Sequence, residues 1–460
     1  MNAVAKAGVG AIALLWLGGS VAARADEKAA APGQAAEAKA SGEPTAPSKP
    51  VDQSKPGPEK PKPVVIVSAS SEDGFVVRSE NGSFRLQLKA LVQFDGRFFL
   101  ADGDKALTNN LLIRRARPIF QGTIARYFDF NLTPDFGGTA VVLQDAYLDA
   151  RPSAAFGVRI GKQKPPIGIE HLQSDTYLGF IERALPSGLV PNRDVGVQIH
   201  GDLRQGVVSY AAGVFDGTPD GASVDVGTGD GKAFVGRLVL SPFKTGKSAL
   251  KGLSIGLGAS SEKQAGASAT LAGYRSGGFN PFFLSYAQGI GPSGTRARLA
   301  PELSYFSGPV GLLAEYVKSQ ARLAKTTTSG GVTTTTATHT LANEAWQATL
   351  SVFVTGDQAG FEGAKIKKPF DPAKGQWGGF QLAARLNGFA ADPDTFSLGW
   401  ADPARSAQKA LAWGLGVTWY LNKNLKQAVT FEHTTFTGGA AKGADRPTEN
   451  ALLIRTQLSF

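Results

Sequence analysis

The last eleven residues of the chain alternate between apolar and polar side chains. Every second residue from Leu452 to the terminal Phe460 is apolar apart from one threonine, whereas Arg455, Gln457 and Ser459 occupy the intervening positions. Successive side chains of a strand point to opposite faces, so this pattern predicts a strand with one apolar and one polar face. Many earlier segments repeat the alternation. Strands with lipid outside and water inside have this pattern, and we therefore expect a transmembrane β-barrel.

The longest alternating stretch runs from Phe84 to Phe98 and places seven apolar side chains on one face. No helical period of useful length is present. About 400 residues, at roughly 25 residues per strand and connection, predict an all-β antiparallel barrel of about 16 strands with an aqueous lumen. Further alternating stretches are Phe128–Thr133, Phe156–Ile160, Phe234–Leu240, Leu253–Leu257, Arg298–Phe306, Trp346–Val354, Phe380–Leu386, Leu411–Leu421 and Val429–Phe436.

Short turns and longer polar stretches are expected to alternate between the strands. The longer ones include Phe215–Lys232, the Thr-rich Ala324–Thr340 and Asp357–Gly378, which we predict to be surface loops. Aromatic rings near strand ends suit a membrane interface. These rings belong to Trp346, Trp413, Trp419 and Tyr420.

The N-terminal region is typical of an export signal followed by a flexible tether. The apolar run Gly8–Gly19 is too short to span a bilayer as a helix and precedes an Ala23-Arg24-Ala25 cleavage pattern. Residues 26–63 are rich in Ala, Pro, Lys and Glu and cannot bury enough surface to fold alone. We predict a signal peptide at 1–25, a disordered periplasmic tether at 26–63 and the barrel at 64–460; a frayed N-terminal helix is the alternative.

Charge and composition narrow the function. The 48 basic residues outnumber the 38 acidic ones, and residues 64–460 retain an excess of eight. The absence of cysteine excludes disulfides, thiolate metal sites and cysteine nucleophiles. No nucleic-acid motif accompanies the dispersed basic residues, so we expect no nucleic acid as partner.

Strand parity indicates which charges face the lumen. The basic side chains of inward parity are Arg85, Lys89, Arg97, Arg115, Arg117, Arg159, Arg237, Arg298, Arg385 and Arg455. The acidic ones are fewer, chiefly Asp95, Asp129, Asp145, Glu302 and Glu315. A pore lined by guanidinium groups favours anions over cations. The alternative is that these arginines pair with carboxylates across the lumen and only maintain the shape of the barrel.

The densest basic spot lies within LLIRRARP, residues 111–118. Adjacent strand residues point to opposite faces, so only one of Arg114 and Arg115 should face the lumen unless a bulge or strand end intervenes. Arg115 and Arg117 share parity with each other, opposite to Phe120, and are the pair we favour.

Several ordered blocks resemble the phosphate-selective porin O and P family of Gram-negative outer membranes. The blocks are RRARP (114–118), YFDFNLTPDFG (127–137), LQDAYLDARP (143–152), IGKQKPPIGIEHLQS (160–174), IERAL (181–185), PNRDVGVQIHGD (191–202), LAGYRSGGF (271–279), ARLAPELSYFSGPVGLLAEYV (297–317), FVTGDQAG and GGFQLAARLNGF within 353–389, WYLNKNLKQAVTFEH (419–433) and the terminal Phe460. The resemblance implies a barrel of 16 strands, usually trimeric, with an inward-folded third loop and basic residues that steer oxyanions to a constriction.

Carried onto this sequence, the resemblance places the constriction near Arg115, with Asp145 opposite and the folded loop at Lys162–Arg193. Where a phosphate-selective member would carry a lysine before the IERAL block, this chain offers His171. Histidine is largely neutral above its pKa of about 6.5, and His171 could equally be a loop residue bonded to Glu170 or Asp175. The candidate anion-binding and pore-lining residues are Lys89, Arg114, Arg115, Arg117, Asp145, Lys162, Lys164, His171, Arg183, Arg193, Arg275, Arg296 and Arg298.

These features predict an outer-membrane porin of a Gram-negative bacterium, selective for phosphate or related oxyanions. The expected partners are phosphate or other inorganic anions, outer-membrane lipid and two further copies in a homotrimer; we expect no cofactor, metal or catalytic residue. A weakly selective general anion porin and a porin for neutral sugars remain alternatives, although most aromatic residues have outward parity. A barrel-borne hydrolase is a further alternative, since His171, His200, His339 and His433 could each serve as a base.

Overall fold

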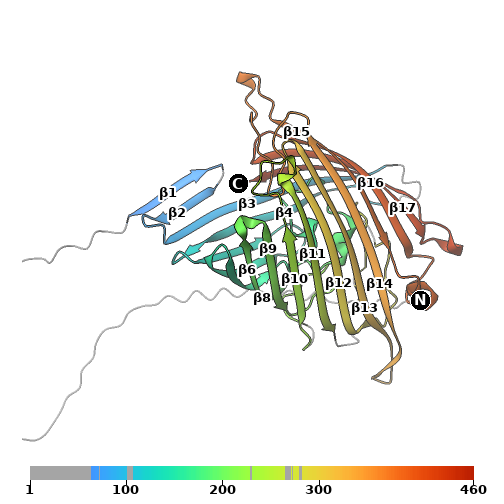
Figure 1. Ribbon diagram of the computed structural model, residues 1–460. Helices are drawn as coiled ribbons and strands as arrows, with labels where there is room; N and C mark the ends of the chain where they lie inside the picture. The colour runs from blue at the N-terminus through green and yellow to red at the C-terminus, as the bar shows by residue number, and fades with distance from the viewer. Residues whose placement is uncertain are drawn as a thin grey trace, which may run out of the picture. The chain divides into compact units, whose positions relative to one another are not determined.

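The strands of the barrel form one antiparallel sheet whose first and last members meet (Figure 1). The computed structural model describes residues 64–71, 73–100, 107–227, 230–264, 271, 273–278 and 282–460. A single unit runs from Lys62 to Phe460, and the description concerns this unit alone. The predicted signal peptide and the predicted tether, residues 1–63, lie outside the described residues, and both remain predictions.

Sixteen strands, β3 to β18, close the barrel, and pairing of β18 with β3 completes it. The last strand therefore pairs with the first long strand, as closure of a barrel requires. The strands are β1 (Val65–Ser70), β2 (Gly74–Ser79), β3 (Phe84–Phe99), β4 (Asn110–Ile124), β5 (Phe128–Asp135), β6 (Val142–Ser153), β7 (Phe156–Gln163), β8 (Asp194–Leu203), β9 (Val208–Phe215), β10 (Ala233–Leu240), β11 (Leu253–Gln264), β12 (Ile290–Ser307), β13 (Val310–Ser329), β14 (Val332–Phe353), β15 (Gly379–Ala390), β16 (Ala407–Tyr420), β17 (Leu425–Gly438) and β18 (Glu449–Ser459).

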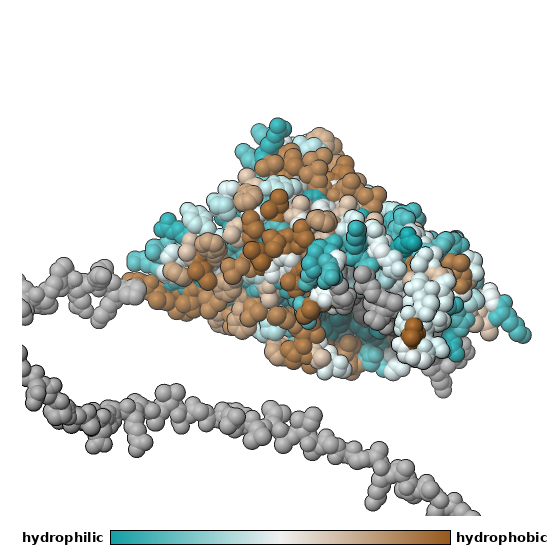
Figure 2. All heavy atoms as spheres, turned by 90° about the horizontal axis from the view of Figure 1, so that it is seen from below, coloured by the Kyte–Doolittle hydropathy of each residue, from teal (hydrophilic) through white to brown (hydrophobic). Residues whose placement is uncertain are grey.

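Alternation separates a lipid-facing outer surface from a polar interior. In β18 the side chains of Ile454 and Leu458 are 39% and 42% exposed, whereas Arg455 between them is 3% exposed. In β3 the side chains of Phe84 and Phe94 are likewise outward and exposed. Apolar side chains cover much of the face shown in Figure 2. The predicted parity of both strands is confirmed.

Two further strands lie outside the closed wall. Strand β1 pairs with β2, and β2 pairs with the first residues of β3, from Arg85 to Leu88. The pairing of β3 with β18 begins only at Leu91. The hairpin thus extends the sheet beyond the C-terminus, where Phe75 packs edge-on against Phe460 with ring centroids 5.9 Å apart.

Short turns gather at the end of the barrel that carries the C-terminus, which in such barrels faces the periplasm. One prediction about loops was wrong, and another loop lies at an unexpected end. Residues 354–378 form the predicted loop between β14 and β15, but this loop lies at the short-turn end. Residues 324–340 are mostly strand, because threonine favours extended structure and the two-residue turn Gly330-Gly331 has positive φ at both positions.

Helices are few and short. They are α1 (Ile169–Leu172), α2 (Asp394–Ser397), η1 (Leu185–Leu189), η2 (Arg204–Gly206), η3 (Ala249–Gly252), η4 (Pro372–Lys374) and η5 (Ala441–Gly443). No helix in the described part of the chain is long and apolar enough to cross a membrane.

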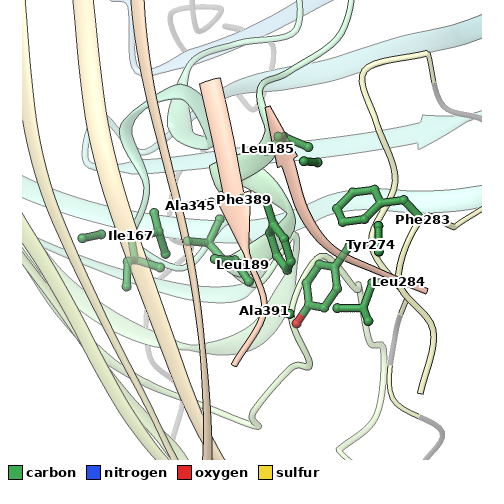
Figure 3. Packing of buried hydrophobic residues seen from close by; sticks show 14 of the residues in the cluster. Ile167, Leu185, Leu189, Tyr274, Phe283, Leu284, Ala345, Phe389 and Ala391 are labelled. Atoms are coloured by element: carbon green, nitrogen blue, oxygen red, sulfur yellow. The ribbon is translucent and has the colours of Figure 1, made fainter. Parts of the chain in front are cut away.

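Two segments fold into the lumen and build an apolar core there. The connection between β7 and β8, residues 164–193, carries α1 and η1, and η1 lies against β13, β14 and β15. Its Leu189 is fully buried in a cluster with Phe389 of β15 and with Tyr274 and Phe283 of the β11–β12 connection (Figure 3). The inward-folded third loop is confirmed. The second inward segment, of which residues 271, 273–278 and 282–289 are described, was not predicted from the sequence.

Candidate functional site

The lumen contains two cavities, one on each side of the inward loop 164–193. The outer cavity has a volume of about 430 Å³ and is bordered by residues of the long-loop end, among them Arg275 and Phe282. The inner cavity has a volume of about 490 Å³ and reaches toward the short-turn end at Gln121 and Arg237. Three residues border both cavities: Arg117, Asp175 and Arg193. We name these three the constriction.

Asp175 of the inward loop forms ion pairs with three arginines. Arg115 Nε lies 3.2 Å from Asp175 Oδ2, and Arg117 and Arg183 each form a shorter ion pair with the same carboxylate. Burial alone would raise the pKa of Asp175, but Arg115, Arg183 and Arg117 outweigh it and hold the pKa well below its usual range. The carboxylate therefore stays ionised, and this one negative charge forms ion pairs with three guanidinium groups.

Glu182 forms a second junction between the loop and the wall. Its carboxylate accepts from Arg114 Nε at 2.7 Å and lies 3.3 Å from Arg97 and 3.4 Å from Arg455. Arg455 also forms two 2.7 Å hydrogen bonds with Asp95 on the neighbouring strand. These contacts join the loop to β3, β4 and β18. For Arg97, Arg114 and Arg455 the structure supports the alternative in which arginines hold the shape of the barrel.

A β-bulge turns both adjacent arginines inward. The register of β3 with β4 shifts so that Gln93 faces Arg115 and Phe94 faces Ile113, which leaves Arg114 unmatched. Arg114 can therefore reach Glu182 while Arg115 Nη1 donates to Gln93 Oε1 at 2.7 Å. We expected only one of Arg114 and Arg115 to face the lumen unless a bulge intervened. A bulge is present, and both arginines face inward.

Lys164 and His171 lie together at the start of the inward loop. Lys164 Nζ donates to the backbone oxygens of His171 at 2.6 Å and Gln173 at 3.0 Å and borders the inner cavity. In the described part of the chain no carboxylate forms an ion pair with Lys164. Burial, together with Arg183 and Arg193, lowers the pKa of Lys164 well below its usual value.

His171 is a satisfied loop residue. It is buried, and its Nε2 donates to the backbone oxygen of Asn192 at 2.9 Å rather than to Glu170 or Asp175. Burial, followed by the charges of Lys164, Arg183 and Arg193, lowers the pKa of His171 well below 6.5. His171 is therefore neutral near pH 7 and adds no positive charge to the outer cavity that it borders.

The remaining predicted residues divide between cavity walls and buried pairs. Arg193 Nε lies 3.5 Å from Asp145, and Arg275 stacks over the Phe282 ring at 4.3 Å in the outer cavity. Lys162 is buried against Asp225 and borders neither cavity. Lys89 is half-buried on β3, opposite Ile119.

Arg296 and Arg298, which were predicted to bind anions, are buried in ion pairs with carboxylates. Arg296 lies 3.2 Å from Glu262, and Arg298 forms a 2.8 Å hydrogen bond with Asp220. Both guanidinium groups are buried within these pairs, so they contribute to the wall of the barrel.

More carboxylates point inward than strand parity predicts. The buried acidic residues that it missed include Asp135, Asp149, Glu170, Asp175, Glu182, Asp220, Glu262 and Glu432. Those on the inward loop have no strand parity that could reveal their direction, although Glu182 lies inside the IERAL block. Gln163 was also missed; it borders the inner cavity, is 1% exposed, and neither its side-chain oxygen nor its nitrogen has a protein partner among the described residues.

The four histidines have structural partners. His200 pairs with Asp149, His339 with Asp394 and His433 with Asn450, each through a hydrogen bond of 2.8 or 2.9 Å. Among the described residues no group of three or more His, Cys, Asp or Glu is placed to hold a metal ion.

Comparisons with known proteins agree with this architecture. The sequence model of phosphate-selective porin O and P matches residues 84–460. No curated protein matched the chain. Among solved structures, the outer membrane channel DcaP of Acinetobacter baumannii is similar at 12% identity, with 83% of this chain and 99% of that chain covered and a TM-score of 0.51.

An anion-selective porin from Comamonas acidovorans is similar at 13% identity, with 82% of this chain and 100% of that chain covered and a TM-score of 0.48. The family match spans the whole closed wall and the inward loop. The chain therefore belongs to the phosphate-selective porin O and P family and is a porin of the Gram-negative outer membrane.

Proposed function

We propose that the chain forms an anion-selective channel whose selectivity arises at the constriction and the charges beside it. The observation that carries the proposal is a local surplus of positive charge. Among the described residues, Arg115, Arg117, Arg183 and Arg193 form ion pairs with three carboxylates, those of Asp135, Asp145 and Asp175, and Lys164 beside them forms none. Fixed positive charge in a narrow lumen lowers the energy of anions and raises that of cations.

The same surplus extends into both cavities. Six basic and four acidic side chains border the outer cavity, and five basic and two acidic side chains border the inner one. An anion would therefore meet a net positive wall on both sides of the constriction. Electrostatic attraction of this kind raises the local anion concentration and falls with ionic strength.

Within the anions, we propose that oxyanions such as phosphate are favoured. Guanidinium groups bind such oxygens in a bidentate manner, and Arg117 and Arg193 present two of them at the constriction. Gln163 adds an unmatched amide in the inner cavity. The runner-up is a general anion channel, because most of these arginines already bind carboxylates.

Competition between phosphate and chloride tests the proposal. Single-channel chloride current is recorded in a neutral planar bilayer while phosphate is added at constant ionic strength. An oxyanion site at the constriction predicts saturable block by phosphate that weakens in Arg193→Gln. Chloride current that is larger than potassium current but insensitive to phosphate would favour the general anion channel instead.

We further propose that the chain assembles as a homotrimer, as the family resemblance implies, and that inorganic anions are its soluble ligands. One solved structure of similar fold is described as the trimer form of OmpT from Vibrio cholerae, with 10% identity, 82% of this chain and 100% of that chain covered and a TM-score of 0.49. Sedimentation of the purified channel in detergent of matched density measures the subunit number directly.

A further inference from the structure

The connection between β14 and β15 is unusually long for the end of the barrel at which it lies. It contains 25 residues, 354–378, whereas the next longest connection at that end, 241–252, contains 12. It is drawn in orange above the β15 label in Figure 1. Its first part turns toward the lumen, where the backbone oxygen of Phe361 accepts from Gln173 at 2.9 Å. Its second part, residues 365–377, faces outward.

The outward part carries an aromatic cluster on the barrel wall. Phe370 contacts Trp377 and Trp419 with ring centroids 5.7 Å apart in each pair, and Phe380 stacks on Trp419 at 5.8 Å. Trp419 Nε1 donates to the backbone oxygen of Trp377 at 2.6 Å, which ties the connection to β16. Trp377 remains 60% exposed. We name Phe370, Trp377, Phe380 and Trp419 the aromatic cluster.

The aromatic cluster continues the lipid-facing surface of β15 and β16. Outward residues further along these strands, including Leu382, Leu415 and Val417, are 47%, 56% and 48% exposed. Tryptophan and phenylalanine at the end of such a band belong at the level of the lipid head groups. The cluster therefore lies where the inner-leaflet head groups meet the barrel.

Four exposed lysines surround the aromatic cluster: Lys365, Lys367, Lys368 and Lys374. Lys374 pairs with Asp371 at 2.6 Å, and Lys367 Nζ donates to the backbone oxygen of Gly356. Among the described residues, neither Lys365 nor Lys368 forms an ion pair with a carboxylate. At least two ammonium groups are therefore available to an anionic head group beside the rings.

The turn between β10 and β11, residues 241–252, also combines lysines with exposed apolar side chains. It contains Lys244, Lys247 and Lys251 and no acidic residue. Two apolar side chains accompany them, Phe243 at 38% and Leu250 at 45% exposure. A second, separate segment of the same end thus combines lysine with exposed apolar side chains.

The two ends of the barrel differ in charge. The seven connections between wall strands at the short-turn end contain ten basic and three acidic residues. The described residues of the long-loop connections, apart from the inward loop, contain five basic and eight acidic residues. Positive charge is therefore concentrated at the end that faces the phospholipid leaflet.

We propose that residues 365–377 bind anionic glycerophospholipid of the inner leaflet, with the lysines on the phosphate and the aromatic cluster against the glycerol and upper acyl chain. Lysines near an anionic lipid surface each strengthen attachment, and aromatic rings fix the depth. A soluble anionic polymer would use the lysines but not the exposed indole ring of Trp377 or the exposed aliphatic side chain of Leu250, which is why lipid is the favoured occupant.

Native mass spectrometry of the full-length channel tests the proposal. The channel is transferred into mixed micelles that contain equal amounts of phosphatidylglycerol and phosphatidylcholine with identical acyl chains, and the bound lipids are counted. The test variant is K365Q/K367Q/K368Q/K374Q. The matched control, K232Q/K325Q/K409Q/K442Q, removes four lysines near the opposite end of the barrel.

Wild type should prefer phosphatidylglycerol, and the test variant should lose this preference by more than about tenfold, whereas the control should change it by less than about twofold. High salt should abolish the preference of wild type, which provides a result that does not depend on the folding of any variant. Equal binding of the two lipids by wild type, or equal loss in both variants, would overturn the proposal.

The same variants separate lipid from cell-wall polymer. If the test variant loses retention on isolated peptidoglycan but keeps its phospholipid preference, the lysines serve the polymer and the lipid proposal is wrong. Ion selectivity plays no part in either readout, so failure here leaves the proposed anion channel untouched, and the reverse also holds.

Discussion

Neutralising Lys164 is the sharpest perturbation of the proposed selectivity, because this lysine borders the inner cavity and has only carbonyl partners. Lys162 provides a matched control: it lies two residues earlier, is buried against Asp225 and borders neither cavity. Lys164→Gln and Lys162→Gln remove the same charge from adjacent inward positions. Only the first removes a charge that a permeating ion meets.

The magnitude follows from Coulomb's law. An ion about 6 Å from the ammonium group interacts with it by about 0.7 kcal/mol in water, or about 0.4 kcal/mol after screening at 0.1 M salt. Loss of the charge raises the free energy of an anion in the lumen and lowers that of a cation by similar amounts. The chloride-to-potassium permeability ratio should therefore fall about fourfold. A lower dielectric constant in the lumen would enlarge the effect. At about 1 M salt the same calculation leaves less than a 1.5-fold change.

The assay is the zero-current potential across a neutral planar bilayer at low and high salt, recorded at the acidic end of the pH range in which the channel is stable, because the lowered pKa of Lys164 makes its protonation most complete there. Lys164→Gln should lower the permeability ratio by about fourfold or more at low salt. Lys162→Gln should lower it by less than about twofold. Equal effects of the two substitutions would refute the reasoning, as would an effect of Lys164→Gln that does not depend on salt.

Three further outcomes are expected. Because burial and its arginine neighbours lower the pKa of Lys164, its positive charge is present at low pH and is lost as pH rises through this lowered pKa; anion preference should fall with it, and Lys164→Arg should keep the preference constant in zero-current recordings. Asp175→Asn leaves three arginines without their shared carboxylate, which should raise anion preference and cost the inward loop about 3–5 kcal/mol, measured as faster proteolysis within 164–193; unchanged selectivity and cleavage would contradict the role of Asp175. Leu189→Ala should cost about 2–5 kcal/mol and increase gating noise while the barrel keeps its heat-modifiable migration on gels, whereas quiet single-channel traces would show that the apolar cluster does not hold the loop.

Strand parity was predictable from the sequence because lipid on one side and water on the other impose a period of two. The faces of β3 and β18 follow from that period, and their pairing follows from closure of the barrel. Strands β4, β6, β8, β9 and β13 were not delimited. In β13 the outward Lys318 and Gln320 interrupt the apolar face, whereas the outward face of β8, with the exposed Val197 and Ile199, does carry an apolar signal.

The interior was less predictable for a physical reason. Residues of an inward loop have no regular period, so nothing in the sequence shows that Asp175 and Glu182 reach the arginines of β4. The bulge at Arg114 breaks the parity rule at the most basic position of the wall. The resemblance indicated which segment folds inward, and only the structure shows how many carboxylates come with it.

The central claim is that a surplus of positive charge around the constriction selects anions. The most direct test is the zero-current potential of the wild-type channel in a neutral bilayer with unequal potassium chloride on the two sides. The account predicts the sign of an anion-permeable pore, and Arg117→Glu combined with Arg193→Glu should reverse or abolish it. A cation-selective or zero potential in the wild type would contradict the account.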